Sequence, residues 1–248
     1  MSPWRIDRTL VAALIVLLAV FGVFELSHLD IAVQDHLFDF ARGRWLIDAQ
    51  APVWRFWLYN LPKWLIIALG VALLALAVGP ARWRARWPIA APARRQLWVA
   101  FLTIGAVPTV IGQLKATTNI FCPSEVRRYG GDVPYVRVIE CYPENDTPTR
   151  RGRCWPAGHA SGGFALLALM GLARTRRGQR IGLALGLGAG GLMGFYQMAK
   201  GAHYLSHTLI TALLAWIGFL LMRRAFGVHR LRELSEPGDP SGSVDDRR

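Results

Sequence analysis

The sequence predicts an all-α polytopic membrane protein, a bundle of six transmembrane helices with both termini in the cytoplasm. Its composition, its six apolar runs and the distribution of its arginines support this prediction. Of 248 residues, 53% are hydrophobic and only 18% are charged, whereas a soluble domain carries about 25% charged residues. The 25 glycines and 10 tryptophans are also typical of membrane proteins. The composition excludes a disordered chain, a collagen and a small disulfide scaffold.

Six apolar runs supply the predicted spans. They cover residues 10–26, 64–78, 97–114, 161–173, 181–199 and 205–222. Since a spanning helix needs about 20 mostly apolar residues, the fourth run is short and must borrow from residues 154–160 or from its C-terminal flank. The first run is long and no small-residue cleavage site follows it, so we expect a retained anchor and not a cleaved signal.

Arginine clusters set the expected orientation. They precede the first run, separate the second from the third and the fourth from the fifth, and follow the sixth; their members are Arg5, Arg8, Arg82, Arg84, Arg86, Arg94, Arg95, Arg174, Arg176, Arg177, Arg180, Arg223, Arg224, Arg230 and Arg232. If all six runs span, the clusters share one side, which the positive-inside rule makes the cytoplasm. A net charge of +13 would also suit a nucleic-acid partner. We expect none, because these clusters form no basic face of a soluble fold.

The runs divide the chain into four parts. Residues 1–27 form an N-terminal anchor helix, residues 28–60 an outer interfacial segment, residues 61–224 the membrane core, and residues 225–248 a cytoplasmic disordered tail. Within the interfacial segment we expect one interfacial helix, and a plain amphipathic connector is the favoured interpretation. The core includes an outer loop, residues 115–160, that is too long and too polar for an idle connection.

All three cysteines, Cys122, Cys141 and Cys154, lie in this outer loop. Outside the cytoplasm a disulfide persists, so one pair and one free thiol are expected. We favour Cys122 with Cys154, a pair that would tie the end of the third span to the start of the fourth. The sequence leaves Cys141 with Cys154 open.

Three polar clusters stand at the outer ends of the predicted spans, where ionisable residues are costly and often functional. Lys115 directly follows the third run, at its outer end. His159 follows Gly158 at the start of the fourth, where exposed N–H groups and the helix dipole favour an anion. His203 and His207, between the fifth and sixth runs, are one helical turn apart and therefore face the same way.

Together these clusters offer the groups that phosphoryl transfer needs. Cations and N–H groups stabilise charge on the equatorial oxygens. One imidazole can attack phosphorus and form a covalent intermediate, and another can protonate the leaving oxygen. This chemistry requires no metal and no cofactor, and we predict neither.

The chain resembles the type 2 phosphatidic acid phosphatase superfamily over residues 60–222. That family carries K-x6-R-P, P-S-G-H and S-R-x5-H-x3-D at the outer ends of the third, fourth and fifth-to-sixth spans of a six-helix bundle. Here Lys115 precedes Cys122-Pro123, Pro156-Ala157-Gly158-His159 fits the second motif, and Tyr196-Gln197 precedes His203 and His207 at the spacing of the third. Cys122, Ala157, Gln197 and His207 replace the family's Arg, Ser, Arg and Asp.

The resemblance implies a role for each matching residue. His203 takes the phosphoryl group as nucleophile, His207 occupies the place of the Asp that orients it, and His159 is the general acid. Lys115 and the backbone of Gly158 form part of the phosphate cradle, with Gln197 at the position of a missing Arg. Nearby replacements for the two missing arginines are Lys200, the best placed, and Arg127, Arg128 and Arg153.

These observations predict a metal-independent membrane phosphatase that acts on a lipid phosphate or diphosphate at the outer face of a bacterial inner membrane, with a membrane lipid as its partner. The excess of arginine over lysine suggests the GC-rich bacterial genome. Three alternatives stay open: a lipid-to-lipid phosphotransferase, a non-catalytic protein that binds or moves an anionic lipid, and a metal site of His159, His203 and His207. The lipid and the oligomeric state are not predicted.

Overall fold

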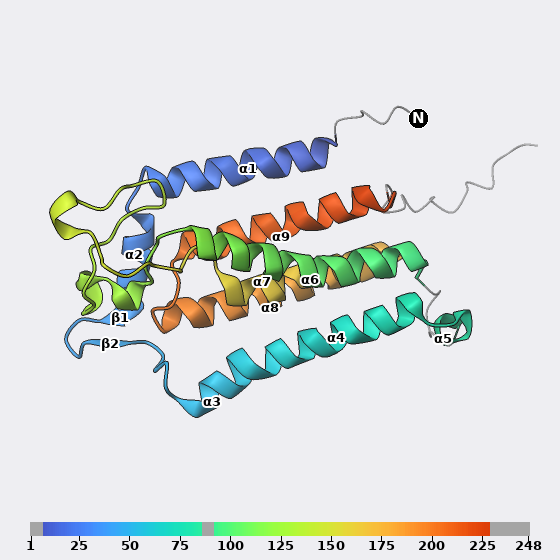
Figure 1. The fold of residues 1–248 in the computed structure, drawn as a ribbon. Helices are drawn as coiled ribbons and strands as arrows, with labels where there is room; N and C mark the ends of the chain where they lie inside the picture. Colours follow the sequence, from blue (N-terminus) through green and yellow to red (C-terminus); the bar gives the residue numbers. More distant parts are fainter. Residues whose placement is uncertain (1–6, 86–91, 229–248) are drawn as a thin grey trace, which may run out of the picture.

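The protein is a bundle of long helices with a small cap of loops and short elements at one end (Figure 1). The computed structural model describes residues 7–85 and 92–228. Its helices are α1 (Arg8–Glu25), α2 (Leu29–Asp35), α3 (Pro52–Arg55), α4 (Leu61–Val78), α5 (Ala81–Ala85), α6 (Arg94–Thr117), α7 (Gly158–Ala165), α8 (Arg176–Ala199) and α9 (Leu205–Ala225). Strands β1 (Phe38–Asp39) and β2 (Arg44–Trp45) form an antiparallel hairpin, a small departure from the predicted all-α fold.

Five helices are long and apolar enough to cross a membrane, which confirms the expectation of a helical membrane protein. They are α1, the continuous helix Pro52–Val78, α6, α8 and α9. The π-helical turn Phe56–Asn60 joins α3 to α4 within the second of these.

The fourth apolar run forms a shorter helix than the others. The helix α7 begins at Gly158, so the fourth run is extended by residues 158–160 of the predicted flank but not by residues 154–157. The 3-10 helix Leu166–Leu172 continues it, and such a helix rises about 2.0 Å per residue instead of about 1.5 Å. This tighter winding recovers part of the missing length, and a sixth span stays a prediction.

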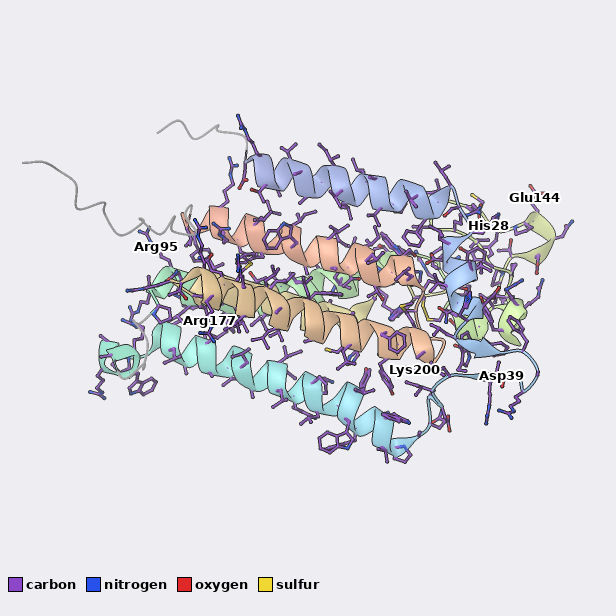
Figure 2. All side chains as sticks on the ribbon, turned by 180° about the vertical axis from the view of Figure 1, so that it is seen from behind. His28, Asp39, Arg95, Glu144, Arg177 and Lys200 are labelled. Carbon is purple, nitrogen blue, oxygen red and sulfur yellow. A yellow bond between two sulfur atoms is a disulfide. The ribbon has the colours of Figure 1, made fainter. Side chains whose placement is uncertain are left out.

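The two ends of the bundle differ in charge. Figure 2 shows Arg95 and Arg177 at one end, and His28, Asp39, Glu144 and Lys200 at the other. The predicted cluster members Arg5, Arg86, Arg230 and Arg232, and the predicted tail from residue 229 onward, lie outside the described residues.

The helix α7 with its 3-10 continuation forms the centre of the bundle. It packs against α6, α8 and α9, while α4 lies on α6 and α1 lies on α9 (Figure 1). The main core combines apolar side chains from α4, α6, α7 and α9, such as Leu73, Ile104, Phe164 and Phe219. Since lipid-facing surfaces are also apolar, α1 and α4 keep large exposed hydrophobic residues on their outer sides.

A stripe of glycines lets α8 lie very close to α7 and to its 3-10 continuation. The glycines recur every fourth residue, at Gly182, Gly186, Gly190 and Gly194, and all four are buried. A Cβ at Gly186 would lie 2.5 Å from the backbone N of Leu167, and one at Gly182 would lie 2.5 Å from the backbone N of Met170. Small residues at this spacing allow close backbone approach between membrane helices, so the stripe fixes how near α8 comes to the centre of the bundle.

Replacing one glycine of the stripe tests this close approach. Gly186→Ala places its Cβ against backbone, which cannot move away as a side-chain end can, and overpacking of this kind costs about 1–3 kcal/mol. We expect the thermal unfolding temperature of the purified protein in detergent to fall. Gly188→Ala is the matched control, because a Cβ there meets nothing within 4 Å on the same helix. Equal unfolding temperatures for the two variants would contradict the packing.

The outer segment is more than the plain amphipathic connector that we favoured. Its helix α2 buries two polar residues, Asp30 and Gln34. The amide of Gln34 donates to the backbone oxygen of Met198 at 2.9 Å, and the N–H of Ile47 donates to the oxygen of Ala199 at 3.0 Å. These bonds satisfy the last carbonyls of α8, which have no partner inside the helix. The segment therefore packs onto the end of α8 and reaches the region of the predicted site.

Candidate active site

The C-terminal end of α6 and the N-terminal end of α7 bring the first two polar clusters together. Lys115 lies in the last turn of α6, and Gly158 opens α7. A Cβ at Gly158 would lie 3.8 Å from Cδ and 4.0 Å from Nζ of Lys115. The lysine side chain therefore passes directly over the start of α7. Because N–H groups at a helix start favour an anion, the ammonium group and α7 offer positive charge to the same place.

A disulfide connects the outer loop across these two helix ends. Cys122 is bonded to Cys154, and Cys141 is free and exposed. The N–H of Cys154 donates to the oxygen of Ile120 at 2.8 Å, and the hydroxyl of Thr118 donates to the oxygen of Trp155 at 2.7 Å. These bonds join the chain just after α6 to the chain just before α7, and so fix the two ends of the loop relative to each other.

The turn between α8 and α9 places the two histidines of the third cluster at the inner edge of this loop. His203 is 3% exposed and His207 is 2% exposed. Their Nδ1 atoms lie 3.4 Å apart, so one ring donates to the other. The Sγ of Cys154 lies 3.5 Å from Nδ1 of His203. With its Nδ1 engaged by His207, His203 has Nε2 left for a reacting group.

Gly201 makes the tight turn before His203 feasible. Its φ of 76° lies in the left-handed region, which glycine enters without steric cost. A Cβ there would also collide with the ring of Trp45 from the hairpin. Its backbone oxygen accepts the N–H of Ser124 at 2.9 Å. The turn is therefore held from both the hairpin and the outer loop.

His159 is held by the end of the second membrane helix. Its Nε2 donates to the backbone oxygen of Leu58 at 3.1 Å, and its ring stacks on Tyr59 with centroids 4.2 Å apart. Both partners belong to the π-helical turn Phe56–Asn60, and such turns often occur at functional sites. The Nζ of Lys200 lies 5.3 Å from the Tyr59 ring. Tyr59 therefore lies against both His159 and Lys200, the residue that follows α8.

Most of these groups line one cavity of about 820 Å³, whereas His207 lies beside His203 and does not itself line the cavity. One part of its wall is polar and consists of Tyr59, Lys63, Lys115, His159, Gln197, Lys200 and His203, with Gly158 beside Lys115. The other part is apolar and comes from α4 and α6, through Ile66, Ile67, Gly70, Val71, Phe101, Ile104, Gly105 and Pro108. Val71 and Gly105 are exposed at the outer surface of the bundle, so the apolar part reaches the side of the molecule that faces lipid.

The polar part of the cavity carries a concentrated positive charge. Lys63, Lys115 and Lys200 all line it, and they are the only lysines in a chain with 29 basic residues. Burial lowers the pKa of Lys200, and the nearby Arg55 lowers it further. Burial, with His207 and Lys115 nearby, holds the pKa of His203 well below its ordinary value. A neutral His203 ring keeps the lone pair that a nucleophile needs.

The structure places the predicted arginines away from this cavity. Arg127 forms an ion pair with Asp146, and Arg128 pairs with Asp35 at 2.7 Å. Arg153 is exposed, and none of the three lines the cavity. Their nearness in sequence was misleading, because the acidic partners that hold them outward come from α2 and from a distant part of the loop. Lys63, and not one of these arginines, lines the cavity as the third cation with Lys115 and Lys200.

Sequence reasoning missed Tyr59 and Lys63 as site residues. The scarcity of lysine was a usable signal, since Lys63 is one of three in the whole chain. Tyr59 gave no such signal, because an aromatic residue before a span is typical of a membrane interface.

The structure also bears on the metal alternative. The ligand atoms of His203, His207 and Cys154 lie within 4.8 Å of one another, all buried. The sulfur of Cys154 belongs to the disulfide and is therefore not the thiolate that binds zinc. His159 is held separately by Leu58 and Tyr59.

Comparison with known protein families agrees with this geometry. The model of the PAP2 superfamily matches residues 96–230, more than half of the chain. The chain belongs to the PAP2 superfamily. The matched region contains α6 from its third residue onward, α7 to α9 and all three polar clusters, which confirms the resemblance drawn from the motifs. Searches of curated proteins and of solved structures gave no match. Membership in the PAP2 superfamily indicates a membrane phosphatase.

The different positions of Lys63 and Arg128 give a test of the cavity as an anion site. Lys63→Gln removes one of its three ammonium groups, and we expect the dissociation constant for inorganic phosphate to rise roughly tenfold, as the loss of one charge-assisted hydrogen bond does. Isothermal titration calorimetry of the purified protein in detergent measures it. Arg128→Gln is the control and should leave phosphate affinity unchanged, because Arg128 is paired outside the cavity. A rise in the dissociation constant for Arg128→Gln that equals or exceeds the rise for Lys63→Gln would contradict the assignment of the cavity as the anion site.

Proposed function

We propose that this protein is an integral membrane phosphatase that removes phosphate from a lipid phosphate or diphosphate through a phosphohistidine intermediate. The shape of the cavity carries the proposal. Cations and imidazoles lie in one part of it, while residues of α4 and α6 extend it as an apolar wall to the lipid-facing surface. A lipid with a charged head and an apolar tail matches both parts.

In the proposed first step Nε2 of His203 attacks phosphorus, and the bond between phosphorus and the lipid oxygen breaks. The leaving oxygen takes the Nδ1 proton of His159, whose Nε2–H is donated to Leu58. The negative charge of the bound phosphate favours this doubly protonated ring. His207 holds the other nitrogen of His203. Lys63, Lys115 and Lys200 stabilise the charge on the equatorial oxygens.

In the second step water attacks the phosphohistidine. His159 takes a proton from this water, the bond between phosphorus and Nε2 breaks, and inorganic phosphate leaves. A second lipid in place of water would make the same protein a lipid-to-lipid phosphotransferase. All of these steps use side chains of the chain, and no metal or cofactor takes part in them.

We further propose that the site faces the outer side of a bacterial inner membrane and that both termini face the cytoplasm. Arg95 and Arg177 lie at the end of the bundle opposite to Lys200 (Figure 2). By the positive-inside rule the arginine-rich end is cytoplasmic. The Cys122–Cys154 disulfide lies at the other end, where an oxidising compartment would preserve it.

Phosphate release tests this function directly. The substrates are undecaprenyl diphosphate, lipid A, phosphatidylglycerol phosphate and phosphatidic acid, each supplied in detergent with EDTA present. We expect the wild-type protein to release phosphate from at least one of them, and His203→Ala to release none. Activity that EDTA abolishes would favour a metal mechanism, and activity that survives His203→Ala would exclude His203 as the nucleophile. Phosphate transfer to a lipid without release would identify the phosphotransferase.

The apolar wall of the cavity gives a second test. Gly105→Leu adds a side chain where nothing lies within 4 Å, so it fills the apolar part of the cavity without a clash in the fold. We expect KM for a long-chain lipid phosphate to rise about tenfold, while hydrolysis of a short, water-soluble phosphate monoester stays unchanged. Gly112→Leu is the control, because Gly112 is equally open on the same helix and does not line the cavity. Equal effects of the two variants on the lipid would contradict the proposed position of its tail.

A further inference from the structure

A buried carboxylate outside the cavity holds the helix that carries His207. Asp30, on α2, is 7% exposed. It accepts the backbone N–H of Ser206 at 2.8 Å and the hydroxyl of Ser206 at 2.5 Å. Ser206 is the second residue of α9, where N–H groups have no partner inside the helix. Asp30 therefore caps α9 from a distant segment of the chain.

A second, much smaller cavity connects this carboxylate with His207. It has a volume of about 10 Å³, and its wall includes Asp30, Tyr135, Tyr204, Ser206 and His207. A space of this size accommodates one water molecule if polar partners surround it. The hydroxyl of Tyr204 is buried and meets no hydrogen-bonding partner among the described side chains and backbone. Since a buried polar group without a partner is costly, this hydroxyl points to a water in the cavity.

We propose that one buried water, held by Tyr204, joins Asp30 to His207, and that Asp30 in this way supplies the negative charge that the third motif lacks at position 207. The inference rests on the proposed function. In it Asp30 is a positioning residue, because it acts on His203 only through His207. It lies outside residues 96–230, the part of the chain that matches the PAP2 superfamily.

The arrangement gives a continuous path for the charge that develops during attack. When Nε2 of His203 bonds to phosphorus, the ring becomes positive. Its Nδ1–H donates to Nδ1 of His207, and the other nitrogen of His207 donates to the water, which donates to Asp30. No proton has to leave its atom: each hydrogen bond strengthens as positive charge forms at one end and meets negative charge at the other.

The charge of Asp30 depends on pH in the physiological range. Burial raises the pKa of its carboxyl group to about 6, although the hydrogen bonds from Ser206 oppose the rise. The titratable or charged groups that face it are Glu25 from α1, Tyr135 and Arg137 from the outer loop, Tyr204 at the start of α9, and His207 on α9. Because the folded pKa exceeds the unfolded value of 3.8, the free energy of unfolding falls as the pH rises from about 4 to about 6 and stays lower above that pH. Protonation below about pH 6 removes the charge of Asp30 from the relay.

Asp30→Asn separates this role from a purely structural one. The amide oxygen still accepts from Ser206, and Asn caps helices well, so the unfolding temperature at pH 7.5 should be unchanged or higher. We expect kcat to fall about tenfold to a hundredfold, as it does when a carboxylate that orients a metal-bound histidine is removed in metalloenzymes. KM should be unchanged. In the wild-type protein we expect kcat to fall below about pH 6, where Asp30 becomes protonated, and this fall should be absent in Asp30→Asn. Asp35→Asn, on the same helix but paired with Arg128, is the matched control and should keep wild-type kcat.

A structure at a resolution that shows water tests the relay without any activity. We expect a water within hydrogen-bonding distance of the Tyr204 hydroxyl, Asp30 and His207, and its loss in Tyr204→Phe. A dry cavity would overturn the relay even if the enzyme is active. Wild-type kcat and pH profile in Asp30→Asn would also overturn it. If no lipid is hydrolysed by the wild-type protein, the proposed function fails, and the presence of this water still decides the structural part.

Discussion

The site depends on the short turn between α8 and α9, because all the polar clusters meet beside this turn. The neighbouring segments fix the turn through several separate contacts. Gln34 holds the carbonyl end of α8, Trp45 covers Gly201, and Asp30 caps α9. The disulfide of the outer loop lies against His203. Because these contacts come from segments far apart in the sequence, the two histidines are fixed in a buried place where a free loop would leave them exposed and mobile.

The glycine stripe of α8 makes this arrangement compatible with a membrane bundle. By bringing α8 close to α7, the stripe places the ends of both helices beside the end of α6. Cations at these ends would repel one another without an anion between them. Three lysines lining one cavity therefore form a site whose electrostatic energy improves when a phosphate enters. The apolar wall from α4 and α6 makes a lipid the phosphate carrier that matches it.

Much of the site was predictable from the sequence, because the motif spacing places residues at helix ends. Lys115, Gly158, His159, Gln197 and His203 were predicted from that spacing, and Lys200 from its nearness to His203 in the sequence; all six line the cavity. Arg127 and Arg128 were not correctly placed, because their ion pairs with Asp146 and Asp35 depend on tertiary contacts. Asp30 and Gln34 looked like the polar side of an amphipathic helix, and only the fold shows that this side faces the α8–α9 turn.

The secondary structure, like the site, was only partly predictable from the sequence. Five apolar runs correspond to long helices, since hydrophobic length is a local property of the sequence. The fourth run was recognised as short, but its 3-10 continuation and its start at Gly158 follow from packing inside the bundle. The hairpin β1–β2 was not predicted, because its two-residue strands are too short to leave a periodic pattern.

The central claim is that His203 becomes phosphorylated. The most direct measurement is a rapid quench of the protein with a lipid phosphate that carries radiolabelled phosphorus, followed by peptide mapping. We expect a label that is stable in alkali, labile in acid and attached to the peptide that contains His203. Phosphate release with no labelled peptide, or a label attached to a different residue, would contradict it.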